Sequence, residues 1–139
     1  MDEWTVVEVR TTEEWSRAIP LLRQLWTDAD ESFVESWAEE DGYRLLCLVV
    51  DDAYVAVVGL SIQRVLHHAR HVWVHDFVVD EAHRSSGYGA TLLSAVEDWA
   101  RERDCTSVAL ACRLGNEAAH GFYEHLGFED WATVMEKSP

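Results

Sequence analysis

A short turn, Arg84-Ser85-Ser86-Gly87-Tyr88-Gly89, has the residue types and spacing that most clearly predict chemistry in this chain of 139 residues. It follows a continuous apolar strand, Val72–Val79, and precedes an amphipathic helix that begins near Gly87. A helix N-terminus presents outward-pointing backbone N–H groups and partial positive charge, and glycine lets an anion approach the main chain closely. The segment therefore predicts a phosphate-binding turn.

Three kinds of glycine-rich phosphate loop compete for this turn. A P-loop needs a lysine directly after its second glycine, but Lys137 is the only lysine in the chain. The dinucleotide-binding fingerprint needs a third glycine, and Leu92 stands at that position. What remains is Arg-x-x-Gly-x-Gly, which by itself fits either an anion site or a plain helix-starting turn.

Two ionisable side chains lie on the strand before this turn. Histidine accepts a proton near neutral pH, directly or through a water, so His75 is a candidate general base. Its alternative is a core histidine satisfied by a backbone partner. Asp76 is a lone carboxylate among apolar residues, and we expect it to assist His75 or to contact a substrate ammonium. Regular alternation would place His75 with Trp73 and Phe77 on the face opposite Asp76.

A second motif lies between Asn116 and Phe128, after an expected strand Ser107–Arg113. Its pattern, Asn-x-x-Ala-x-x-Phe-Tyr-x-x-x-Gly-Phe, together with the upstream turn, resembles the GNAT superfamily of acetyl-CoA-dependent N-acetyltransferases. Both motifs stand in the family's order and at its usual separation, and the resemblance spans residues 42–136. It implies an enzyme that transfers an acetyl group from acetyl-CoA to a primary amine by direct attack.

The resemblance also implies where acetyl-CoA binds. Backbone N–H groups of the turn would hold the pyrophosphate, with Arg84 positioning the turn or adding charge. The sheet would splay beside the strand that carries Phe77, exposing main-chain groups to the acetyl and pantetheine arm and supplying an oxyanion donor. The expected cofactor-binding residues are Phe77, Val78, Val79, Arg84, Ser85, Ser86, Gly87, Tyr88, Gly89, Ala90 and Asn116.

Tyr123 aligns with the catalytic tyrosine of the family and is the predicted general acid. A phenol can protonate the departing CoA thiolate, although a core aromatic with a polar tip is the alternative. Asn116 has the simple alternative of a helix cap. Tyr123, His75 and Asp76 form the predicted catalytic set.

No metal is expected. The three cysteines, Cys47, Cys105 and Cys112, lack metal or redox spacing and are interpreted as small buried residues. The run His67-His68-x-x-His71 lies in an expected loop, where helical spacing cannot make the rings converge, and no cysteine accompanies it. A solvated loop or the rim of the acceptor site explains it better.

The formal net charge is −15 at pH 7, which opposes binding to nucleic acid phosphates. Either an acidic cleft for a cationic amine or a surface adapted to high salt would explain this charge. We favour the second explanation because the acidic residues are spread along the whole chain. No apolar stretch is long enough to span a membrane and no signal-peptide pattern is present, so a cytoplasmic location is expected.

The acceptor is the least constrained part of the prediction. A small-molecule amine and a protein amine, at a lysine or N-terminus, both fit, and a homodimer is common in the family. Val58–Leu60, His67-His68 and His71–Trp73 are similar to small-amine members, particularly aminoalkylphosphonate-type acetyltransferases, though the acidic charge opposes an anionic phosphonate. From another class, a catalytically silent acyl-CoA-binding regulatory module is the alternative.

The elements that must position these residues suggest one α/β domain over residues 1–139. We expect a mixed, mostly antiparallel sheet of six to seven strands, flanked by about four helices. Two capping boxes, Thr11–Glu14 and Ser32–Glu35, each predict a helix start, and Pro20 should bend or interrupt the first helix. The expected strands are Trp4–Arg10, Tyr43–Val50, Tyr54–Leu66, His71–Val79, Ser107–Arg113 and Phe128–Met135.

Overall fold

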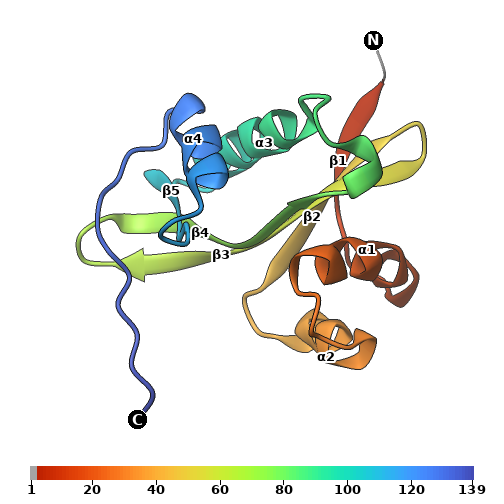
Figure 1. Ribbon diagram of the computed structural model, residues 1–139, viewed down its shortest axis with the longest axis horizontal. Coiled ribbons are helices and arrows are strands. Elements are labelled where there is room, and N and C mark those ends of the chain that lie inside the picture. The colour runs from red at the N-terminus through yellow and green to blue at the C-terminus, as the bar shows by residue number, and fades with distance from the viewer. Residues whose placement is uncertain (1–2) are drawn as a thin grey trace. The chain divides into compact units, whose positions relative to one another are not determined.

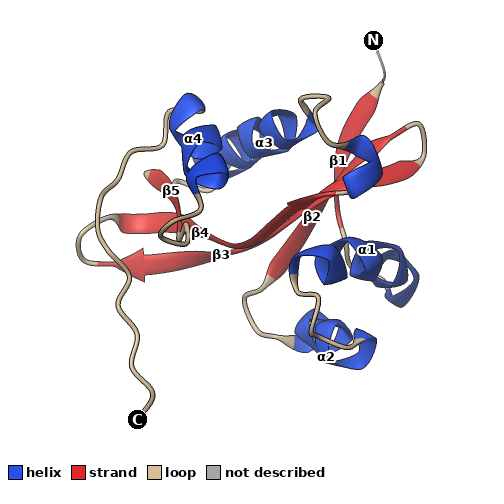
Figure 2. Cartoon of the chain, viewed as in Figure 1, coloured by secondary structure: helices blue, strands red, loops and turns tan. Residues whose placement is uncertain are grey.

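A single five-stranded sheet organises the computed structural model, which describes residues 3–139 (Figures 1 and 2). The strands lie in sequence order, and the first four pair in antiparallel fashion. They are β1 (Trp4–Glu8), β2 (Arg44–Val50), β3 (Ala53–Val65), β4 (Ala69–Val79) and β5 (Ser107–Leu110).

The described residues also form four α-helices and two short 3-10 helices. They are α1 (Thr12–Leu25), α2 (Glu31–Glu35), η1 (Ser36–Glu39), η2 (Glu81–His83), α3 (Tyr88–Glu102) and α4 (Glu117–His125). Among the described residues, no helix is long and apolar enough to cross a lipid bilayer. The described residues divide into two compact units, one ending at Ala109 and one beginning at Leu110. The single-domain assignment stays a prediction.

In the first unit, α1 and α3 cover opposite faces of the sheet (Figure 1). Alternate residues of a strand point to opposite faces, so the sheet contributes side chains to a hydrophobic core on each face. The face under α1 buries Leu45, Cys47, Val57 and Val78 against the helix residues Ala18, Ile19 and Leu22. The other face takes the intervening strand residues Leu46, Leu48, Val58 and Leu60, beside the buried α3 stripe Leu92, Leu93, Val96 and Ala100.

A complete capping box begins α1, as the sequence predicts. The Glu14 N–H donates to Thr11 Oγ1 at 3.1 Å, and the Thr11 N–H donates to Glu14 Oε1 at 2.9 Å. Pro20 does not interrupt this helix, which continues to Leu25. Because Pro20 lies on the exposed side, water can satisfy the carbonyl that its missing N–H leaves without a helical donor.

The second predicted capping box is wrong by two residues. The N-cap of α2 is Asp30, whose Oδ1 accepts from the Phe33 N–H at 2.8 Å, while Ser32 lies inside the helix. A carboxylate near a helix N-terminus accepts the N–H bond and also interacts favourably with the helix dipole. After one turn, α2 tightens into η1, so the chain reaches Glu39 as two short helices rather than one.

The sheet has five strands, and the prediction of six to seven is therefore wrong. The expected strand Phe128–Met135 is irregular, and its side chains Trp131, Val134 and Met135 are exposed. A strand needs a neighbouring strand for its backbone hydrogen bonds. Within residues 110–139, the only regular elements are α4 and the last residue of β5. This unit therefore contains no neighbouring strand with which residues 128–135 could pair.

Removing the α1 cap should destabilise the protein. We expect Thr11→Ala to lower the free energy of unfolding by about 1 kcal/mol, because the Glu14 N–H loses its acceptor. Thr12→Ala is the matched control, since Thr12 is exposed and lies one residue inside the helix. Urea denaturation followed by circular dichroism measures both. Equal stability of the two variants would contradict the capping role.

Candidate active site

The glycine turn forms the N-terminus of α3. Gly87 is the N-cap with φ +82°, and no side chain caps the helix there. The helix's first bond at this end runs from the Thr91 N–H to the Gly87 carbonyl at 3.1 Å. The N–H groups of the intervening turn therefore point out of the helix end, which is the geometry of an anion site. Ser85 also has positive φ, at +68°, which tightens the turn.

Arg84 ties this turn to the end of β4. Its Nε donates to the Val79 carbonyl at 3.0 Å, across the short connection that contains η2. This hydrogen bond links the turn to the strand, and the role of Arg84 toward a bound pyrophosphate stays a prediction. Phe77, Val78 and Val79 pair with Val58, Val57 and Ala56 of β3, and the Val78 side chain is buried under α1.

A clamp from α1 holds the same connection, and sequence reasoning missed it. Gln24 Nε2 donates to Asp80 Oδ1 at 2.7 Å, and the Glu81 N–H donates to Gln24 Oε1 at 2.9 Å. The other Asp80 oxygen lies 2.8 Å from His83 Nδ1. The Gln24 hydrogen bond, and then His83, lower the pKa of the Asp80 carboxyl. A glutamine on an amphipathic helix gives no sequence signal for such a contact.

A β-bulge at His75 changes which side chains share a face of β4. Gly59 pairs with Asp76 and Leu60 pairs with Val74, so His75 is the extra residue between them. Beyond the bulge the alternation is reversed. Asp76 consequently lies on the face of Trp73 and Val78, and the expected separation of His75 and Asp76 onto opposite faces is wrong.

Asp76 is held by two neutral donors. The Tyr43 hydroxyl donates to Oδ2 at 2.7 Å, and Trp26 Nε1 donates to Oδ1 at 2.6 Å. Asp76 and Tyr43 are half-buried, while Trp26 is 49% exposed at the end of α1. Burial, followed by the negative charge and hydrogen bond of Asp76, strongly raises the pKa of Tyr43, so its phenol stays a donor.

Gly59 makes room for this pair. A Cβ built on Gly59 would overlap the Tyr43 hydroxyl and lie 2.9 Å from Asp76 Oδ2. The Tyr43 side chain therefore crosses β3 at a position where only glycine fits. No local pattern predicts this contact, because Tyr43 and Asp76 are far apart in sequence.

His75 is exposed rather than a core histidine. Its Nε2 lies 2.8 Å from Ser61 Oγ, and its ring centroid lies 6.0 Å from that of Tyr43. The structure thus brings His75 and Asp76 together around one tyrosine. The serine can fix one ring nitrogen of His75 while the other is available for proton transfer.

Tyr123 lies in the second unit, on α4. It is half-buried, and burial together with the nearby Cys112 raises the pKa of its phenol. The Phe128 N–H donates to the Tyr123 carbonyl and the Gly127 N–H donates to the Glu124 carbonyl, both at 3.0 Å. With Gly127 at φ +96° and the Tyr123 and Phe128 rings 5.6 Å apart, this is a Schellman C-cap.

The other end of α4 is capped by Asn116, whose Oδ1 accepts from the Ala119 N–H at 3.2 Å. The capping alternative therefore accounts for Asn116 by itself. Four motif residues, Asn116, Tyr123, Gly127 and Phe128, thus have structural roles in forming and ending the helix that carries the phenol. The role of Asn116 toward a pantetheine arm stays a prediction.

The histidine run lies at the hairpin between β3 and β4. His71 is buried, and its Nε2 lies 3.1 Å from Gln63 Oε1. Burial, with smaller contributions from His68 and His67, lowers the pKa of His71. In residues 3–139, no group of three or more histidine, cysteine or acidic side chains is arranged to hold a metal ion.

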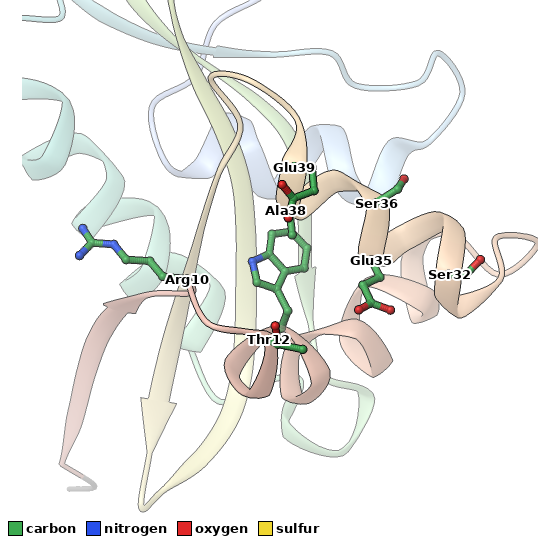
Figure 3. A pocket seen from close by; sticks show the side chains of 8 residues that line it. Arg10, Thr12, Ser32, Glu35, Ser36, Ala38 and Glu39 are labelled. Carbon is green, nitrogen blue, oxygen red and sulfur yellow. The ribbon is translucent and has the colours of Figure 1, made fainter.

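A pocket of about 300 Å³ lies between α1 and the α2–η1 segment (Figure 3). Trp15 lines it, and the Trp15 ring centroid lies 6.3 Å from that of Tyr43. The Tyr43 ring therefore lies between Trp15, which lines the pocket, and the Asp76 carboxylate. The lining of the pocket mixes charges and contains none of the predicted site residues: Arg10, Thr12, Trp15, Ser32, Glu35, Ser36, Ala38 and Glu39.

Comparison with known proteins supports one family. A family model described as Acetyltransferase (GNAT) family matches residues 8–128. The N-acetyltransferase YhdJ of Bacillus subtilis (strain 168) is 32% identical over 126 residues, covering 87% of this chain and 89% of that protein. An aminoglycoside N(6')-acetyltransferase type 1 from Acinetobacter haemolyticus is 26% identical over 124 residues, covering 84% of this chain and 86% of the relative.

Solved structures show the same fold. The aminoglycoside N-acetyltransferase AAC(6')-Iy in complex with CoA matches with a TM-score of 0.88 at 17% identity, covering 100% of this chain and 96% of that one. The fold is therefore an α/β fold shared with solved N-acetyltransferases. The chain belongs to the Acetyltransferase (GNAT) family. The predicted enzyme class and the co-substrate acetyl-CoA are thereby confirmed.

Substituting Gly59 should disrupt the Tyr43–Asp76 contact. We expect Gly59→Ala to cost about 1–3 kcal/mol of stability, because the new methyl group must displace the Tyr43 ring. Thermal and urea unfolding measure the loss. Adding Gly59→Ala to Tyr43→Ala should cost little more than Tyr43→Ala alone.

Gly121→Ala is the control for this substitution. Gly121 lies in α4 with open space around its Cβ position, so alanine there should stabilise the helix by about 1 kcal/mol. A Gly59→Ala protein as stable as the parent would show that Tyr43 is not packed against the strand.

Proposed function

We propose that this enzyme acetylates a primary amine of a small cationic molecule, with His75 as general base and Tyr123 as general acid. The observation that carries the proposal is the joint placement of two features on β4. The end of β4 connects to the N-terminus of α3, which no side chain caps, and Arg84 in this connection donates to the Val79 carbonyl. The bulge in β4 places the His75 and Asp76 side chains on one face of the sheet. An anion-binding turn and a histidine base beside a carboxylate, both on one strand, suit a charged donor and an amine acceptor.

In the proposed reaction, the acceptor nitrogen attacks the thioester carbonyl of acetyl-CoA. A free alkylamine has a pKa of about 10, so it must first lose a proton, which His75 takes directly or through a water. The carbon–nitrogen bond forms as negative charge moves to the carbonyl oxygen, where a backbone N–H near Phe77–Val79 would stabilise it. The carbon–sulfur bond then breaks, and the thiolate takes a proton from Tyr123. The acetylated nitrogen gives up its second proton through water to the resulting phenolate, which leaves a neutral amide and restores the phenol.

The environment of Tyr123 supports its role as an acid. Its raised pKa keeps the phenol protonated near neutral pH, which is the state that a general acid needs. The Schellman cap fixes the C-terminal turn of α4, which carries the ring.

The acceptor proposal rests on relatives and on charge. Three of the curated relatives are named aminoglycoside N(6')-acetyltransferases, and a solved structural neighbour holds a CoA–acetylneamine bisubstrate analogue. Net charge of −15 favours the approach of a cationic amine over that of an anionic phosphonate. We therefore favour a small-molecule amine over a protein amine, and a working enzyme over a silent acyl-CoA-binding module.

Replacing the proposed acid tests the mechanism. Tyr123→Phe keeps the ring and should lower kcat about a hundredfold while leaving CoA affinity unchanged. Steady-state turnover of an amine panel and calorimetric CoA titration separate the two effects. Tyr54→Phe, at the start of β3, is the control, since Tyr54 is not among the proposed site residues, and it should be fully active. Full activity of Tyr123→Phe would remove the general-acid assignment.

Gly87→Val should instead remove CoA binding. Valine is strained at φ +82°, and its branched side chain would stand at the N-terminus of α3 where the phosphates are proposed to bind. We expect at least a tenfold weaker CoA affinity in calorimetry, with thermal stability measured in parallel. Unchanged CoA affinity in a folded variant would refute the pyrophosphate assignment.

A further inference from the structure

The Asp76 carboxylate is aligned by neutral groups and has no cation beside it. Both of its oxygens accept hydrogen bonds, from Tyr43 and from Trp26. Among residues 3–139, no lysine, arginine or histidine forms an ion pair with it. A half-buried carboxylate in this state keeps lone pairs for a further donor, and a positive ligand is the partner that offsets its desolvation most strongly.

The surrounding residues keep that carboxylate in a fixed orientation. Tyr43 reaches Asp76 only because Gly59 lacks a side chain, and the Tyr43 ring also packs near Trp15. Trp26 holds the other oxygen from the end of α1, and its half-exposed indole stands at the solvent side of the pair. Two donors on two oxygens fix both the position and the plane of the carboxylate.

The role of this carboxylate follows from the chemistry of amine attack. A carboxylate that binds the attacking nitrogen would favour its ammonium form, which has no lone pair for attack. The proton acceptor is therefore better assigned to His75, which lies in the bulge and is held by Ser61. Asp76, one residue away, is then suited to an ammonium group that does not react.

We propose that Tyr43 and Trp26 are positioning residues that hold Asp76 as a docking point for a second, unreactive ammonium of the acceptor. The acceptor class is then a diamine or polyamine rather than a monoamine. This inference rests on the proposed function, since it assigns the reacting amine to His75. It adds two residues, on the segment before β2 and at the end of α1, that no sequence motif marks.

Matched amines test the substrate class. The wild-type enzyme should show a KM for putrescine and cadaverine about tenfold or more below that for butylamine and pentylamine, with similar kcat. Asp76→Asn keeps the shape of the side chain and should abolish this preference by raising KM for the diamines alone. Equal KM values for diamines and monoamines in the wild-type enzyme would overturn the proposal.

Variants of the two donors test the positioning roles. Tyr43→Phe and Trp26→Phe each remove one hydrogen bond to the carboxylate while keeping an aromatic ring. Each should raise the diamine KM several-fold, leave kcat near wild type, and leave monoamine kinetics unchanged. In the Asp76→Asn background neither should have a further effect, because the group they position is gone. Tyr54→Phe is the matched tyrosine control and should change nothing.

Other outcomes separate this inference from the proposed function. Calorimetric binding of cadaverine that is weakened in Tyr43→Phe, without turnover of any amine, would refute acetyl transfer but support the docking point. Turnover of amines without any preference for diamines would support acetyl transfer and refute the docking point. Equal losses for diamines and monoamines in Tyr43→Phe, or full additivity with Asp76→Asn, would show that Tyr43 acts only as a packing residue.

Discussion

One extra residue in β4 sets the geometry of the whole candidate site. Without the bulge at His75, neighbouring side chains would point to opposite faces of the sheet, and no single substrate could meet both His75 and Asp76. The bulge places Asp76 opposite Gly59, and the missing Cβ of that glycine admits the Tyr43 hydroxyl. The register of β4 with β3 is regular on both sides of the bulge, so the irregularity is confined to the residues with proposed chemical roles.

The end of α1 contacts both parts of the candidate site, the connection to the glycine turn and the Asp76 carboxylate. Gln24 holds the connection that leads to the glycine turn at the N-terminus of α3, and Trp26, two residues later, holds the Asp76 carboxylate. Both contacts depend on the packing of α1 against the sheet through Ala18, Ile19 and Leu22. A change in that packing would therefore move the turn and the carboxylate together, which gives the hydrophobic core a direct part in aligning the site.

Contacts between neighbouring residues could be predicted from the sequence, whereas contacts between distant residues could not. The Thr11 capping box and the Gly87 helix start depend on neighbouring residues, and each has the expected local geometry. The bulge and the contacts of Tyr43, Trp26 and Gln24 join residues from different elements, and no local pattern records them. The missing last strand has the same cause, because a strand is defined by a partner as much as by its own sequence.

The overall acidity and the Asp76 site act on different scales. A net charge of −15 spread along the chain attracts any cation and raises encounter rates, but it does not select among amines. Selection requires a charge whose position is fixed relative to the reacting group, since only then does the distance between two amines matter. Asp76 meets that requirement through Tyr43 and Trp26, beside a histidine held by Ser61. Acceptor specificity is thus expected to depend on two neutral hydrogen bonds more than on the many surface carboxylates.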